Sequence, residues 1–213
     1  MSEQVRDVLI PDRDHQLPTW KFPVSPTRVM NDPKTVVDEV FSTFRARGGR
    51  FYGENITETQ HALQCATFAE RDGESETMVA ACLLHDYGHL LHDLGEDIAS
   101  QGVDTRHESV GANRLLRYFK EEIVEPVRLH VAAKRYLCWK DKDYLENLSA
   151  ASMQSLGLQG GVMTDDEGRA FESHPYFKPA LRLRHYDDLG KVPDMATPDF
   201  EHFRSIIEKF VRV

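Results

Sequence analysis

The chain has 213 residues, of which 40% are hydrophobic and 29% charged, and this composition suits one soluble domain with a sizeable core. Its net charge of −9 argues against nucleic-acid binding, which needs a basic surface, but not against a small anionic substrate met by a local cationic cluster. No segment approaches the roughly 18 consecutive apolar residues of a membrane span, and the polar N-terminus indicates no signal peptide. The three cysteines form no CxxC pair, which favours a reducing cytoplasm.

Residues 1–30 contain four prolines and predict an extended arm, followed by one helical domain over residues 31–213. The domain opens with a helix capped by Asn31 or Asp32, with Pro33 in its first turn, that ends near Gly48. Thr57 is a candidate cap for the next helix, which carries His61.

Helical patterns then continue to the end of the chain without strand-like alternation or a hairpin signal. A long buried helix is expected over residues 74–91. Thr164 to Glu167 resembles a capping box after the loop 157–161. Further helices are expected over residues 107–119, 122–139, 144–156, 179–191 and 199–213. The sequence therefore predicts an all-α, single-domain helical bundle.

Residue types that bind metals gather around the pair His85–Asp86, which ends an apolar run. Neighbouring helical residues point about 100° apart, so these two cannot chelate one metal as an i, i+4 pair would. The two oxygens of Asp86 could instead bridge two metals while His85 binds one of them. His61 and Asp187 would complete the first metal.

His107 and His130 would complete the second metal. Imidazole and carboxylate suit divalent first-row ions, and such incomplete ligand sets leave positions open for a substrate or an oxidant. Five other histidines are interpreted as ordinary surface or core residues: His15, His92, His174, His185 and His202.

Hydrogen-bonding side chains lie one helical turn from three of these ligands: His89, Lys134 and Arg184. Each has an ordinary alternative, which for Lys134 is a solvated lysine and for Arg184 a salt bridge to Asp187. Together they indicate an anion pocket beside the metals. Ser152, Ser155 and Gln159 lead into Gly160–Gly161 at helical spacing, and they fit either this pocket or a plain helix end.

Longer strings strengthen the pattern: His85-Asp86-Tyr-Gly-His89, His107-Glu-Ser-Val-Gly, His130-Val-Ala-Ala-Lys134-Arg-Tyr-Leu, the serines before Gln159-Gly-Gly, and Leu183-Arg184-His-Tyr-Asp187 through Lys191. With them, residues 50–192 resemble the mixed-valent di-iron oxygenases of the HD superfamily, the PhnZ type that cleaves carbon–phosphorus bonds. Myo-inositol oxygenase is similar in ligand order but more distant.

The resemblance implies two iron ions (Fe²⁺ and Fe³⁺), with dioxygen as co-substrate and an organophosphonate as substrate. One iron would be bound by His61, His85, Asp86 and Asp187, and the other by Asp86, His107 and His130. The phosphonate would contact His89, Lys134, Ser152, Ser155, Gln159 and Arg184, with Asp86 and Lys134 as the catalytic pair. The products would be phosphate and glycine, or phosphate and glycine betaine.

The amine end of the substrate would meet Glu54. In the family a tyrosine closes the resting site ten residues before the first histidine ligand; here that position is Phe51, and the neighbouring Tyr52 is the candidate to serve instead. Whether the amine is primary or trimethylated stays open, and so does the oligomeric state. The competing interpretation is an HD phosphohydrolase that attacks a nucleotide or phosphate monoester with metal-bound hydroxide; a non-catalytic metal-binding module is a third.

Overall fold

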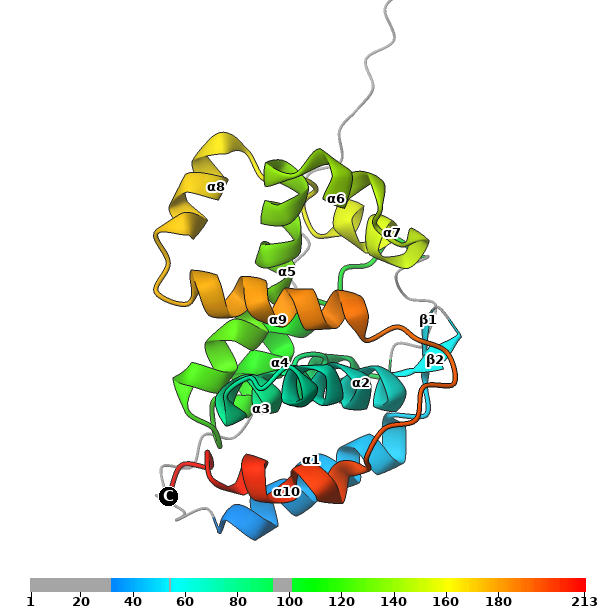
Figure 1. Ribbon diagram of the computed structural model, residues 1–213, viewed down its shortest axis with the longest axis vertical. Helices are drawn as coiled ribbons and strands as arrows, with labels where there is room; N and C mark the ends of the chain where they lie inside the picture. The colour runs from blue at the N-terminus through cyan, green and yellow to red at the C-terminus, as the bar shows by residue number, and fades with distance from the viewer. Residues whose placement is uncertain (1–31, 54, 94–100) are drawn as a thin grey trace, which may run out of the picture.

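The structure is a computed structural model that describes residues 32–53, 55–93 and 101–213. These ranges fold into a helical bundle with one small hairpin (Figure 1), so the all-α prediction is confirmed. None of the helices in these ranges is long and apolar enough to cross a membrane. The elements are α1 (Pro33–Arg47), β1 (Phe51–Gly53), β2 (Ile56–Thr57), α2 (Glu58–Arg71), α3 (Glu76–Leu84), the 3₁₀ helix η1 (Tyr87–Leu91), α4 (His107–Leu115), α5 (Glu121–Lys140), α6 (Lys142–Glu146), α7 (Ala150–Leu158), α8 (Asp165–Glu172), α9 (Phe177–Leu189) and α10 (Phe200–Glu208).

Helix starts follow the capping signals of the sequence. The Asp32 carboxylate accepts the backbone N–H of Thr35 at 3.0 Å ahead of Pro33 in the first turn of α1. Thr57 caps α2 in a reciprocal capping box with Gln60. The capping box expected at Thr164 opens α8, so these predictions are confirmed. The arm predicted over residues 1–30 lies outside the described residues.

The long helix expected over residues 74–91 is wrong in its second half. α3 ends at Leu84 with His85 as its C-cap, and the chain continues as η1. Gly88 explains why the α-helix does not continue: its backbone packs so closely on α4 that an added Cβ would lie 2.0 Å from the His107 carbonyl oxygen. This backbone contact joins η1 to the start of α4, and it leaves Asp86 between two helical segments.

Two further expectations are corrected. The helix expected over residues 144–156 is broken, because the Asn147 side chain donates to the Asp143 carbonyl and Ser149 caps a new helix by accepting the Ser152 N–H at 3.2 Å. A hairpin was also not expected, but β1 and β2 pair antiparallel. Strands of three and two residues are too short to show alternation in the sequence.

The core surrounds α3, whose residues from Met78 to Leu84 are all buried. Figure 1 shows α2 and α3 in the middle of the molecule, with α1 and α10 on one side and α5 and α9 crossing on the other. A smaller aromatic cluster of Tyr136, Phe171 and Phe177 joins α5, α8 and α9. The bundle therefore brings the helices with candidate ligands, α2 to α5 and α9, against one another.

Candidate metal centre

Five segments bring the six predicted ligands to one buried place. α2 supplies His61, the end of α3 supplies His85 and Asp86, α4 begins with His107, α5 supplies His130, and α9 supplies Asp187. None is more than 7% exposed. Their proximity and burial agree with the metal-ligand prediction.

Asp86 lies between two pairs of histidines. Its Oδ2 atom is 3.4 Å from His61 Nε2 and 3.2 Å from His85 Nε2. Its Oδ1 atom is 3.3 Å from His107 Nε2 and 3.5 Å from His130 Nε2. Each carboxylate oxygen therefore faces one histidine pair, the arrangement that a carboxylate bridging two metals requires.

Within each pair the two Nε2 atoms face one another at 3.0 Å. Three of the four rings use their other nitrogen, Nδ1, to donate to a backbone carbonyl at 2.7–2.8 Å. In a neutral ring this leaves the Nε2 lone pair directed inward. The carbonyls belong to Gly190 for His61, Cys82 for His85 and Val127 for His130. Two lone pairs at this distance repel unless a cation lies between them.

Two buried carboxylate oxygens without hydrogen-bond partners also favour a cation at this place. Asp86 Oδ1 and Asp187 Oδ1 are buried and make no hydrogen bond. Burial raises the pKa of Asp86, but His85, His107 and His61 lower it more, so the pKa lies well below its usual range and the group is a carboxylate. A buried, partly unsatisfied carboxylate is costly without a cation. Four imidazoles and two carboxylates thus fit two divalent first-row metals.

Protons compete with metal at the histidines. Burial lowers the pKa of His61, but Cys65, Asp187 and Asp86 together raise it well above its ordinary value, so metal binding at this ring displaces a proton. Burial, only partly opposed by Asp86, lowers the pKa of His130 to about 3. His130 is therefore a neutral ligand at physiological pH.

Two rings cover the centre. Tyr52, on β1, stacks on His61 with centroids 3.9 Å apart, and His89, on η1, stacks on His107 at 4.0 Å. Phe51 instead points outward and is 53% exposed. Of the two aromatic candidates, Tyr52 is therefore the one beside the centre. Glu54 lies outside the described residues.

Two lysines and two serines form a polar cluster next to the candidate ligands. Lys134 Nζ donates to Ser155 Oγ at 2.7 Å, and Lys191 Nζ donates to Ser152 Oγ at 3.2 Å. Burial, together with the charges of Arg184 and Lys191, lowers the pKa of Lys134 to about 8. Gln159 Oε1 is buried without a hydrogen-bond partner. The predicted phosphonate contacts on α5 and α7 are thus brought together, and their role stays a prediction.

Arg184 is held by acidic neighbours. Its Nη1 atom donates to Asp187 Oδ2 at 2.7 Å, and its Nε atom donates to Asp188 Oδ2 at 3.1 Å and to the Tyr144 hydroxyl at 2.9 Å. The salt bridge to Asp187, which is the ordinary role of such an arginine, is present and fixes that carboxylate. Contact with substrate stays a prediction.

Four residues of the site escaped the sequence reasoning: Tyr144, Asp188, Gly190 and Lys191. A Cβ on Gly190 would lie 2.3 Å from Cys65 Sγ, so only glycine brings this carbonyl to His61. The spacing of Lys191 four residues after Asp187 was a usable signal because the sequence predicts a helix through residue 191, although α9 ends at Leu189.

Comparisons with known proteins place the chain in a family. Residues 59–155 match the model of the HD domain. A [1-hydroxy-2-(trimethylamino)ethyl]phosphonate dioxygenase (glycine-betaine-forming) of Leisingera caerulea is 41% identical over 83% of this chain and 90% of its own length. The chain belongs to the HD superfamily, in the branch that contains this dioxygenase.

Two other relatives belong to the same group. A hydroxymethylphosphonate dioxygenase of Gimesia maris is 40% identical over 83% of this chain and 88% of its own length. An uncharacterized protein of Acanthamoeba polyphaga mimivirus, L432, is 34% identical over 82% of this chain. The resemblance stated from the motifs and the expected dioxygenase class are therefore confirmed.

Proposed function

We propose that this HD-domain protein cleaves the carbon–phosphorus bond of a 1-hydroxyphosphonate with dioxygen, at a centre of two irons. The observation that carries the proposal is the position of Asp86, with one carboxylate oxygen toward each histidine pair. The names of two relatives about 40% identical supply the reaction class. The three free, buried cysteines favour a reducing cytoplasm.

His61, His85, Asp187 and Asp86 Oδ2 would hold one iron, and His107, His130 and Asp86 Oδ1 the other. Both sets are incomplete, which leaves positions for the substrate and for dioxygen. Bound iron would supply Lewis acidity and would activate dioxygen, while the electrons that reduce dioxygen would come from oxidation of the substrate. The backbone carbonyls on Nδ1 of His61, His85 and His130 keep three rings in the metal-binding orientation.

The phosphonate group would lie against Lys134, Ser152 and Ser155, with His89, Gln159 and Arg184 around it. Lys134 already donates to Ser155, so the ammonium is held in place before the substrate arrives. Charge-assisted bonds from it would fix the phosphonate and keep the neighbouring hydroxyl directed at the metals. Lys134 therefore orients the reacting carbon.

The two relatives share the phosphonate and its adjacent hydroxyl in their names, whereas only one carries an amine. We therefore place substrate selection at the other end of the substrate, near Tyr52 and Glu54. A trimethylammonium there would be stabilised by charge and by the tyrosine ring, worth roughly 0.5–2 kcal/mol. A primary ammonium would donate hydrogen bonds to Glu54.

The test loads the protein with ferrous iron without oxygen and then supplies oxygen with 2-amino, 2-trimethylammonio, 2-hydroxy and unsubstituted 1-hydroxyphosphonates. The expected result is oxygen consumption coupled to phosphate release, and neither with Asp86→Ala. Release of phosphate from monoesters or nucleotides without oxygen consumption would instead establish the competing phosphohydrolase. Repeating the panel with Glu54→Gln tests the amine contact: equal use of charged and uncharged substrates by the unmodified protein refutes it.

A further inference from the structure

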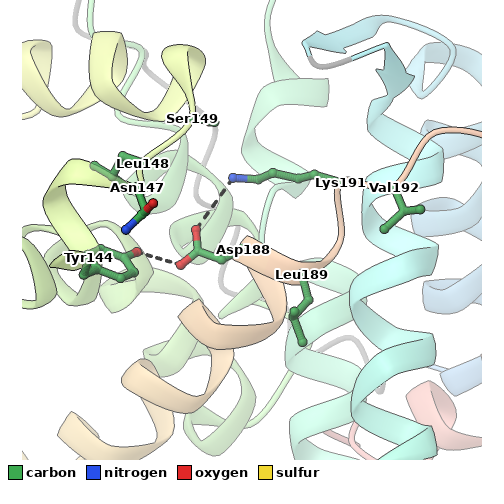
Figure 2. A pocket seen from close by; sticks show the side chains of 8 residues that line it. All are labelled: Tyr144, Asn147, Leu148, Ser149, Asp188, Leu189, Lys191 and Val192. Carbon is green, nitrogen blue, oxygen red and sulfur yellow. Dashed lines mark hydrogen bonds and ion pairs between the residues drawn. The ribbon is translucent and has the colours of Figure 1, made fainter.

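A cavity of about 420 Å³ lies beside the metal centre, between the α6–α7 connection and the C-terminal end of α9 (Figure 2). This volume is in the range of small-molecule sites. Tyr144, Asn147 and Ser149 form one wall, while Leu189 and Val192 are partly exposed on the other. The proposed function assigns no role to this cavity.

Lys191 belongs both to this cavity and to the polar cluster that it forms with Lys134, Ser152 and Ser155. It lines the cavity, yet its side chain is only 9% exposed. Its Nζ atom donates to Ser152 Oγ at 3.2 Å and lies 3.8 Å from Asp187 Oδ1. Figure 2 shows the ammonium directed toward Asp188, at 3.7 Å. One buried cation thus stands at the boundary between the cavity and the metal centre.

Lys191 forms ion pairs with Asp187 and Asp188, but the only hydrogen bond that its ammonium donates among the described residues is to Ser152. Asp188 accepts the Tyr144 hydroxyl at 2.6 Å and the Arg184 Nε–H at 3.1 Å, so its carboxylate is paired without Lys191. At 3.7–3.8 Å from Asp187 and Asp188, the ammonium makes no direct hydrogen bond to either. Because the whole chain carries a net charge of −9, an anion approaching the centre depends on such a local cation.

We propose that the cavity is an outer binding site for the oxyanion group of the phosphonate, and that Lys191 at its inner end passes the substrate to Lys134, Ser152 and Ser155. This inference rests on the proposed function. A phosphate product presents the same oxyanion chemistry to the same ammonium. The outer site is separate from the hairpin side, where Tyr52 covers His61.

The test places a thiol at the cavity wall. Cys65, Cys82 and Cys138 are buried, so Val192→Cys introduces a thiol that a maleimide labels selectively. Val110→Cys is the matched control, because Val110 is 42% exposed against 44% for Val192 and does not line the cavity. Methylphosphonate should slow labelling of Val192→Cys several-fold relative to chloride at equal ionic strength, and leave Val110→Cys unchanged.

Inorganic phosphate distinguishes the two sources of the oxyanion: protection by phosphonate alone assigns the site to incoming substrate, and protection by both assigns it to substrate and product. Adding Lys191→Met should abolish the protection, and Lys191→Arg should retain it. In iron-loaded enzyme, labelled Val192→Cys should lose kcat/KM several-fold while labelled Val110→Cys keeps it.

Equal protection of both thiols, or an unchanged kcat/KM after labelling Val192→Cys, would overturn the outer site. Failure of the proposed function gives a different pattern: the unmodified iron-loaded chain would turn over no phosphonate at all. Protection of the Val192→Cys thiol, and its loss with Lys191→Met, does not depend on turnover.

Discussion

Replacement of Gly190 by alanine should weaken metal binding through His61. The Gly190 carbonyl accepts His61 Nδ1 at 2.7 Å, and an added Cβ would lie 2.3 Å from Cys65 Sγ and 3.3 Å from His61 Nδ1. Gly190 has a negative φ of −74° with ψ 35°, so no left-handed backbone adds to the penalty, and the contact with the Cys65 sulfur is the main cost. Overpacking of this kind costs about 1–3 kcal/mol. Displacing a group that orients a ligating histidine typically lowers metal affinity by roughly 10–100-fold.

Metal affinity would be measured by competition with a chromophoric chelator, and stability by thermal unfolding of the metal-free protein. Gly157→Ala on α7 is the control, because no atom lies within 4 Å of its added Cβ, and it should leave metal affinity unchanged. Combining Gly190→Ala with Cys65→Ala removes the sulfur and should restore most of the lost affinity. Wild-type affinity in Gly190→Ala, or no recovery in the double variant, would refute the reasoning.

Four further outcomes are expected. Elemental analysis should find about two irons per chain in the loaded protein and almost none in Asp86→Ala, since both ligand sets share this carboxylate. One iron retained by Asp86→Ala at unchanged affinity would contradict the bridge. Lys134→Ala should raise KM while iron content stays normal, because the substrate loses a charge-assisted bond worth roughly 1.5–3 kcal/mol of binding free energy. With a Lys134 pKa of about 8, kcat/KM should fall above that pH, and Lys134→Arg should move the fall upward. Because this pKa is lowered on folding, the stability of the metal-free protein should gain from Lys134 as pH rises from 8 towards 10.5, a gain absent in Lys134→Met.

The ligands could be predicted from the sequence because metal binding demands particular residue types. His61, His85, His107 and His130 lie in helical patterns, and the adjacency of His85 and Asp86 led to the prediction that Asp86 could bridge two metals. Helix starts were equally accessible at Asp32, Thr57 and Thr164, since a cap is a local interaction between residues three apart.

Tertiary contacts decided what the sequence did not reveal. α3 ends at Leu84 because Gly88 meets the backbone of His107, a contact between segments 19 residues apart in sequence. The contacts of the Tyr144 hydroxyl with Arg184 and Asp188 likewise depend on α6 lying against α9. Such distant partners leave no periodic signal in the chain.

The burial of α3 has a consequence for the rates of two processes. Backbone amides between Ala80 and Leu84, where every residue is fully buried, should exchange their hydrogens only when the whole domain unfolds. His85 and Asp86 follow directly after this segment, so the release of metals held by them should be as slow as the opening of this part of the fold. Tyr52 lies on a two-stranded hairpin, a structure only marginally stable alone, which opens locally and far more often. With metals bound, the centre would combine slow metal exchange with frequent opening of the hairpin that covers it.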